Sequence, residues 1–230
     1  LRGESDDVFI IQTTGVLTLH TSTKVFLDGG VQAKNVFWVV AGNVAIETGA
    51  EMKGIILCKT NVVLGTGSTL IGSIYAQTQV ALQMATVTQV DTCDAVITPP
   101  VIIAPQEPGV VLKNACNYAV LAETGISSEA TSTVIGDIAV SPIAATAITG
   151  FSLDLDVGAQ FATSSQVEGE AHGADMVAPR NAELTLAVLA MQAAYTDAAS
   201  RLNDDETRKN VGGGDIGGMT LTPGVFTFTT

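Results

Sequence analysis

The sequence predicts a mostly β protein, a three-sided (triangular) β-helix or β-solenoid with one long α-helix packed along one side. Three observations carry this prediction. A seven-residue pattern, Asn43–Gly49, recurs as Asn61–Gly67 and more weakly as Gln79–Ala85, each copy 18 residues after the last. Glycine and β-branched residues punctuate the repeats, and a single helical pattern follows late in the chain. A short fixed period indicates stacked units, here about six residues on each of three sides.

One repeat can be followed side by side. The first side is Asn61–Gly65, the second is Ser68–Ile71, and the third is Ser73–Gln77. Side chains alternate across a strand, so Leu70 is expected to face the core and Thr69 the outside. Each side therefore offers one buried row and one outward row of side chains.

The third side is expected to lie under a helix. Its outward residues are large and apolar, and leaving each exposed forgoes roughly 1.5–3 kcal/mol of burial; they are Ile10, Trp38, Leu57 and Tyr75. The spacing predicts one helix over 181–202, with Asn181 as N-cap. Its apolar stripe comprises Leu184, Val188, Met191 and Tyr195. The alternative is that this helix packs elsewhere.

The whole chain, 1–230, is interpreted as a single domain. Its expected parts are regular coils over 1–89, a Pro-rich connecting strap over 90–113, a coil and cap over 114–180, the helix, and a returning coil over 203–230.

Composition excludes several classes of protein. The net charge of −13 argues against nucleic acid as a partner, because nucleic-acid binding requires a basic surface. No apolar run approaches the 18 or so residues of a membrane-spanning helix, so no membrane partner is expected. Cys58 is at an inward coil position and is expected to be a buried free thiol. Cys93 and Cys116 flank the Pro-rich strap; pairing between them would suit a secreted protein, and the sequence leaves it open.

Motifs for chemistry are absent or unsupported. His20 and His172 have no neighbours at metal-ligand or triad spacing, so both are expected at the surface. Gly212–Gly217 matches G-x-G-x-x-G, but no helix follows it, which favours a turn. We therefore expect no enzyme, no cofactor, no metal and no catalytic residue. A β-helical polysaccharide enzyme is the alternative, and it would need a charged cleft.

The two sides without a helix present small or hydroxylated residues. On the first side the outward residues are Thr18, Ala45, Val63 and Ala81. The second side begins at a Thr-rich corner in several coils. Strands of neighbouring coils lie about 4.8 Å apart, so these residues form a flat, weakly polar lattice. Such a surface has no pocket, but it can hold ordered water and bind a crystalline solid such as ice. The alternative is that Thr simply favours strands.

Longer segments resemble the β-helical ice-binding (antifreeze) proteins of polar microbes. They are Asn35–Gly42, Glu47–Leu57, Thr66–Thr78, Gly136–Pro142, Thr149–Leu153, Ala194–Ala198 and Gly214–Gly224. The resemblance implies a right-handed β-helix with one helix alongside, secretion, no cofactor, and one flat ice-binding face. The segment Thr66–Thr69 looks like the Thr-Ala/Gly-x-Thr motif of that face. Carried onto this sequence, the site comprises Thr21, Thr23, Thr48, Thr66, Ser68, Thr69, Thr131 and Thr133.

The sequence also departs from the family pattern. Lys24, Glu51 and Lys53 are charged residues on an otherwise neutral face. The helix half follows the Trp-containing half, in the reverse of the family order, which indicates a circular permutant or parts of two tandem domains. In a permutant the two ends of the chain should lie near each other. We expect a monomeric, secreted protein that adsorbs to ice, with thermal hysteresis and inhibition of ice recrystallisation. The alternative function is a carbohydrate-binding adhesin or matrix module that uses the same flat face.

Overall fold

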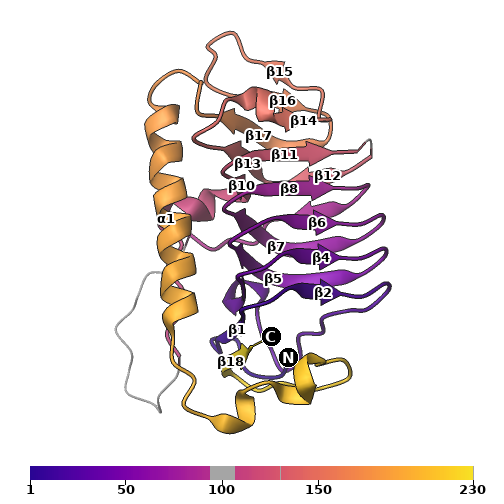
Figure 1. Ribbon diagram of the computed structural model, residues 1–230. Helices are drawn as coiled ribbons and strands as arrows, with labels where there is room; N and C mark the ends of the chain where they lie inside the picture. Colours follow the sequence, from indigo (N-terminus) through magenta and orange to yellow (C-terminus); the bar gives the residue numbers. More distant parts are fainter. Residues whose placement is uncertain (94–106, 130, 230) are drawn as a thin grey trace.

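A computed structural model describes residues 1–93, 107–129 and 131–229 of the chain. Figure 1 shows a stack of β-coils with a single long helix beside it. Two sheets build the stack, a parallel one of 6 strands and a mostly parallel one of 12 strands. The fold is therefore mostly β with one helix, as the sequence predicts. The Pro-rich strap falls largely on 94–106, outside the described residues.

The 6-stranded sheet forms the first side of the coil. Its strands follow the order β14-β11-β8-β6-β4-β2. They are β2 (Leu17–Leu19), β4 (Val44–Ile46), β6 (Val62–Leu64), β8 (Gln79–Leu82), β11 (Gly125–Ser128) and β14 (Ile148–Thr149). All pair in parallel and in register, so each coil places equivalent residues one above the other.

The 12-stranded sheet bends and supplies both other sides. Strands β5 (Glu51–Cys58) and β7 (Thr69–Ala76) turn the corner at Gly54 and Gly72, whose φ angles are +120° and +154°. The second side continues in β9 (Thr86–Thr88) and β12 (Thr133–Ile135). The third side contains β1 (Phe9–Thr13), β3 (Val36–Val40), β10 (Tyr118–Ala122), β13 (Asp137–Val140) and β18 (Gly224–Phe228). Strand β17 (Val167–Gly173) pairs with both β12 and β13 and so also turns this corner.

Shorter elements complete the chain. An antiparallel cap is built from β15 (Asp154–Leu155) and β16 (Ala162–Ser164), the latter also paired with β17. The part of the chain that the structure describes also contains 3₁₀ turns, namely η1 (Ala33–Asn35), η2 (Lys113–Asn117), η3 (Ala145–Ala147), η4 (Glu206–Arg208) and η5 (Val211–Gly214). The G-x-G-x-x-G segment lies in η5 and the turn after it, as expected.

The buried side chains form two hydrophobic clusters. One fills the inside of the coil, with Leu64, Leu70 and the free thiol of Cys58 among its members. Burial raises the pKa of that thiol. The other cluster lies between the third side and the helix α1 (Arg180–Ser200). It contains Ile10, Leu57, Tyr75, Leu184, Val188 and Met191, with Tyr195 packed at its edge. Helix α1 therefore covers the third side.

The prediction for Trp38 is wrong. Trp38 belongs to the inner cluster, and its neighbours Phe37 and Val39 point to the helix instead. The position 18 residues before Leu57 is Val39, which pairs with Leu57 in the sheet. Because side chains alternate, a shift of one residue turns the indole from the outer face to the inner one.

The start of the helix also differs from the prediction. The helix begins at Arg180, and Pro179 takes the N-cap position, so Asn181 lies inside the first turn. The Asn181 Oδ1 accepts a hydrogen bond from the N–H of Ala182 at 2.8 Å. The predicted end at residue 202 is two residues beyond the observed Ser200.

The first and last strands of the chain are neighbours. Strand β1 lies between β18 and β3 at the end of the sheet, with Ile10 opposite Val225, and the marked chain ends lie close together in Figure 1. This is the arrangement expected of a permuted chain.

Cys93 and Cys116 form a disulfide with Cα atoms 5.2 Å apart, which answers the question the sequence leaves open. Within the described residues, no helix has the length and hydropathy needed to cross a bilayer.

Candidate functional site

Two outward rows of side chains run up the second side. Thr69, Thr86 and Thr133 are directly opposite one another in adjacent strands. Ile71, Thr88 and Ile135 form the second row in the same register. We call these six residues the Thr/Ile array. Adjacent strands are about 4.7–4.9 Å apart, and residues two apart along a strand are separated by about 6.6–6.8 Å, which sets the repeat of the array in both directions.

The array is fixed from below by the core. Leu70, Val87 and Val134 alternate with the outward residues and are fully buried inside the coil. The parallel ladder of β7, β9 and β12 holds their backbones in register. A close-packed core of this kind resists deformation, so the outward methyl and hydroxyl groups have fixed positions.

Charged residues border the array at both ends. On one side, Lys24 bridges to Glu51, with Nζ and Oε1 2.5 Å apart, and Glu51 is opposite Thr69. Lys53 is likewise opposite Ile71. On the other side, Glu168 pairs with Ile135 and is exposed. The neutral part of the second side is thus limited to the three coils of the Thr/Ile array.

The corner that leads into the second side carries exposed threonines. Thr21, Thr48 and Thr66 are exposed at successive corners. The backbone N–H and the hydroxyl of Thr21 both donate to Oε2 of Glu47, at 2.9 and 3.1 Å, and these bonds lower the pKa of that carboxyl. Thr23 donates its hydroxyl to the carbonyl oxygen of His20. Thr48 and Thr66 thus continue the outward hydroxyl pattern, whereas Thr21 and Thr23 use their hydroxyls within the corner.

Two predicted site residues do not belong to this surface pattern. Ser68 is fully buried beneath the corner, so its prediction as a surface contact is wrong. Thr131 is exposed, but its φ of +79° shows that it takes the left-handed turn position occupied by Gly67 in the earlier coil. It therefore does not continue the row of Thr48 and Thr66.

Sequence reasoning missed Thr86, Thr88, Ile71 and Ile135. Thr86 follows Thr69 by 17 residues instead of 18, because the corner between β8 and β9 is one residue shorter. A search at a fixed 18-residue period therefore passes over it. The alternation Thr86-Val87-Thr88 is the signal that would have found these two threonines.

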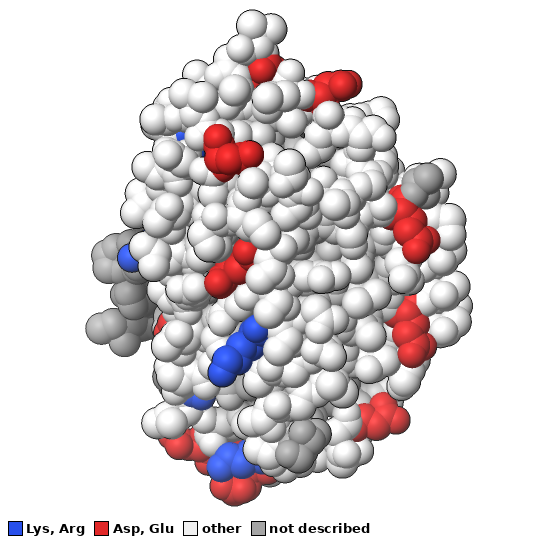
Figure 2. All heavy atoms as spheres, turned by 45° about the horizontal axis from the view of Figure 1, so that its top comes forward, with Lys and Arg blue, Asp and Glu red and all other residues white. Residues whose placement is uncertain are grey.

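The first side is a second neutral surface. Its outward row runs in register through six strands and comprises Thr18, Ala45, Val63, Ala81, Ser127 and Thr149. Each strand contributes one residue to this row, and β8 also exposes Gln79 on the same face. His20, Glu47 and Glu129 follow the strands at the corner, with His20 Nδ1 3.5 Å from Glu47 Oε2. Figure 2 shows this side of the molecule largely white, with acidic side chains along its right-hand edge.

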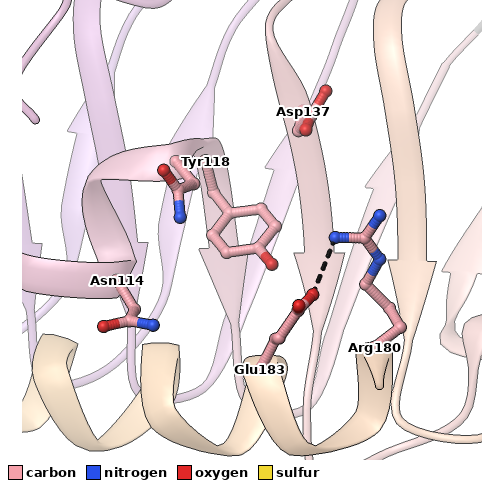
Figure 3. A pocket seen from close by; sticks show the side chains of 6 residues that line it. Asn114, Tyr118, Asp137, Arg180 and Glu183 are labelled. Atoms are coloured by element: carbon pink, nitrogen blue, oxygen red, sulfur yellow. Dashed lines mark hydrogen bonds and ion pairs between the residues drawn. The ribbon is translucent and has the colours of Figure 1, made fainter. Parts of the chain in front are cut away.

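A polar cavity of about 400 Å³ lies beside the first turn of α1. Figure 3 shows Tyr118, Arg180 and Glu183 turned toward one another, with Asp137 above them in the view and Asn114 to the left. Arg180 Nη1 is 3.0 Å from Glu183 Oε2. Burial raises the pKa of Tyr118 to about 12, so the phenol stays protonated. No nucleophile activated by a base lines this cavity.

His172 is fully buried next to this cavity, which contradicts the prediction of a surface histidine. Strand β17 pairs with β13, and this pairing places His172 on the third side. There the imidazole packs edge-on against the ring of Tyr118, with the two ring centroids 6.0 Å apart. His20 is exposed, as expected.

The fold and the outward rows of side chains together define the structural class of this protein. In its described residues this is a three-sided parallel β-solenoid with one helix packed along its third side and neutral outward rows on the other two sides. The model of the Ice-binding-like family matches residues 1–88 and 120–230, so the chain belongs to that family. The two matched segments flank the Pro-rich strap.

Individual relatives match about half of the chain. It is 50% identical over 113 residues to an ice-binding protein of Lentinula edodes, which covers 49% of this chain and 38% of that protein. The chain is 46% identical over 121 residues to an ice-binding protein of Flammulina populicola, and this match covers 53% of the chain and 48% of that protein. The chain is also 56% identical over 120 residues to ice-binding protein K1-A of Typhula ishikariensis, and this match covers 52% of the chain and 49% of that protein. The matches therefore span less than half the length of these curated relatives.

Proposed function

We propose that this protein binds ice through the Thr/Ile array of the second side, with Thr48 and Thr66 at its border. The observation that carries the proposal is the register of Thr69, Thr86 and Thr133 across three adjacent strands. Membership of the Ice-binding-like family and the names of the relatives support the same function. Under this proposal ice is the partner, and neither nucleic acid nor a membrane is required.

The mechanism is surface complementarity without a chemical step. Hydroxyls of the Thr row hold water by hydrogen bonds, while the methyl groups of Thr and Ile restrict that water to an ordered layer. Because the rows repeat at the spacing of a β-ladder, the layer has the same repeat and can merge with a growing crystal. Adsorbed protein then pins the ice front, which lowers the freezing point below the melting point and slows recrystallisation.

The second side suits this role better than the first. In the Thr/Ile array each strand has two outward residues in register, whereas on the first side β2, β4 and β6 each have one. A surface that extends in two directions restrains more water. The first side also ends at Glu47, whose carboxylate is charged at neutral pH and binds water in its own geometry. Thr18, Ala45, Val63 and Ala81 remain the alternative face.

A secreted, monomeric and non-enzymatic protein fits this mechanism. The disulfide between Cys93 and Cys116 suits an oxidising compartment. A carbohydrate-binding module would be expected to expose aromatic side chains on its flat face. Of the aromatic residues that the structure describes, Phe26 alone is exposed, and it lies outside the Thr/Ile array. Ice therefore accounts for the face better than a sugar does.

The test compares a bulky side chain on each face of the same coil. Thr86→Tyr places a ring in the middle of the Thr/Ile array, and Ala81→Tyr places the same ring on the first side, one strand earlier. Circular dichroism establishes that both variants fold. We expect Thr86→Tyr to lose most thermal hysteresis and ice-crystal faceting and Ala81→Tyr to retain both. The reverse result would move the site to the first side, and round crystals with the unmodified protein would contradict ice binding altogether.

A further inference from the structure

A cluster of potential metal ligands lies on the third side, away from the Thr/Ile array. Asp137 begins β13, and Glu170 and His172 lie two residues apart on the adjacent strand β17. His172 Nε2 is 3.4 Å from Glu170 Oε2 and 3.7 Å from Asp137 Oδ2. Ligand atoms of all three residues lie within 4.8 Å of one another. The pairing of β13 with β17 thus brings Asp137 to the two residues of β17, which lie more than 30 positions later in the sequence.

The imidazole in this cluster has no hydrogen-bond partner. His172 is fully buried, and neither Nδ1 nor Nε2 is hydrogen-bonded to any described residue. Leaving a buried polar group unsatisfied costs about 1–3 kcal/mol, so its persistence needs an explanation. The nitrogen Nε2 faces the two carboxylates, which places its lone pair or proton between them.

The surrounding groups orient the two carboxylates. The N–H of Glu170 donates to Asp137 Oδ1 at 2.8 Å, which leaves Oδ2 on the side of His172. Hydrogen bonds of this kind commonly orient metal ligands and tune their basicity. Asp137 also lines the polar cavity of about 400 Å³, which has room for water as a further ligand.

Distances and charge both fit a divalent ion. Bonds of about 2.0–2.1 Å in a tetrahedral site separate neighbouring ligand atoms by about 3.3–3.4 Å, close to the separations seen here. The carboxylates of Asp137, Glu170 and Glu183 outnumber the single guanidinium of Arg180, which leaves two negative charges when His172 is neutral. Imidazole combined with carboxylates favours zinc-type transition metals over calcium or magnesium.

We propose that His172, Asp137 and Glu170 form a binding site for one divalent transition-metal ion of the zinc class. Arg180 competes for this site, since its Nη2 is 3.4 Å from Glu170 Oε2. Ion binding moves the guanidinium fully to Glu183 on the first turn of α1, with which it already pairs. The ion thereby replaces the ion pair between Glu170 and Arg180 and joins β13 to β17, in a structural role that does not depend on ice.

The experiment titrates metal into the full chain after treatment with a chelator. Zn²⁺ binding is followed by calorimetry and Co²⁺ binding by its visible d–d absorption. Expected results are one ion per chain, a higher unfolding temperature in Zn²⁺, and weaker binding at low pH, where protons compete with the metal for the ligand atoms. Glu170→Gln should lower the affinity at least tenfold, and Arg180→Gln should raise it. Glu168→Gln, an exposed carboxylate on the same strand, should leave it unchanged.

Two results would overturn the proposal. Absence of both calorimetric heat and a Co²⁺ spectrum with the unmodified protein would mean that the cluster binds no metal and serves only to join β13 to β17. Equal affinity in Glu170→Gln and Glu168→Gln would place any bound ion elsewhere on this acidic surface. If Glu170→Gln fails to fold, Asp137→Asn takes its place. Thermal hysteresis is measured separately, so a failure of ice binding is distinguished from a failure of the metal site.

Discussion

Trp38 and Gly54 share one corner of the coil, and the indole occupies the space that a side chain on Gly54 would need. A Cβ at position 54 would lie 2.8 Å from Trp38 Nε1 and 2.8 Å from the carbonyl oxygen of Val36. The same Nε1 donates to the carbonyl oxygen of Lys53 at 2.9 Å. The contact explains how an indole fits inside a narrow coil: the corner where the sheet bends has no side chain.

The first prediction concerns this corner. Gly54→Ala introduces both the clash and a side chain at φ +120°, so we expect a loss of about 3 kcal/mol in the free energy of unfolding. Gly67→Ala is the control, because Gly67 has φ +67° but nothing within 4 Å of its added Cβ. That change should cost about 1 kcal/mol. Urea unfolding followed by circular dichroism measures both, and equal losses would mean that the contact with Trp38 contributes nothing.

The second prediction concerns the attachment of α1. Leu184 is fully buried against the third side, whereas Leu189 on the same helix is 56% exposed. Leu184→Ala should reduce the free energy of unfolding by about 3 kcal/mol, through lost burial and a cavity. Leu189→Ala should change it by less than about 0.5 kcal/mol. The same unfolding experiment tests the pair, and a large effect of Leu189→Ala would indicate that a partner covers the outer face of the helix.

The third prediction concerns the disulfide. Cys93 and Cys116 are separated by 23 positions, and closing a loop of that size stabilises the folded chain by about 3 kcal/mol. Replacing both cysteines by serine should therefore lower the unfolding temperature while leaving the Thr/Ile array and its thermal hysteresis intact. A reducing agent should destabilise the unmodified protein and leave the double variant unaffected. Destabilisation of both by the reductant would mean that it does not act through the disulfide between Cys93 and Cys116.

The fourth prediction is a dependence on pH. The bonds from Thr21 lower the pKa of Glu47 in the folded protein. A carboxyl with a lowered folded pKa contributes stability above its unfolded pKa and loses it as the pH falls through the folded pKa. The unfolding temperature of the unmodified protein should thus fall between about pH 5 and pH 3, and less so in Glu47→Gln. Glu168→Gln serves as the control. Identical pH profiles for all three proteins would show that Glu47 does not contribute.

The local pattern of the chain was readable from the sequence. Alternation of side chains in Val62–Leu64 and Thr69–Ile71 gave the correct inward and outward faces, because a strand has a period of two residues. The apolar stripe of Leu184, Val188 and Met191 indicated the helix and the side that it covers. The 18-residue offset identified the coils where the corners keep their length.

The tertiary structure decided what depends on the length of each corner. Between β8 and β9 the corner is one residue shorter, which moved Thr86 into line with Thr69. At β3 the true register put Val39 opposite Leu57, and Trp38 went into the core. A single-residue shift reverses which face a side chain takes, and the sequence alone does not show where the shifts occur.

Burial of the polar residues was likewise a tertiary outcome. Ser68 looked like part of a surface motif, yet it lies inside the corner. His172 had only Glu170 nearby in the sequence, and the pairing of β13 with β17 set it beside Asp137 as well, 35 positions away. Sequence spacing reveals neighbours only within a strand, a helix or a regular repeat. Contacts between irregular coils arise from packing, and only the folded chain brings them together.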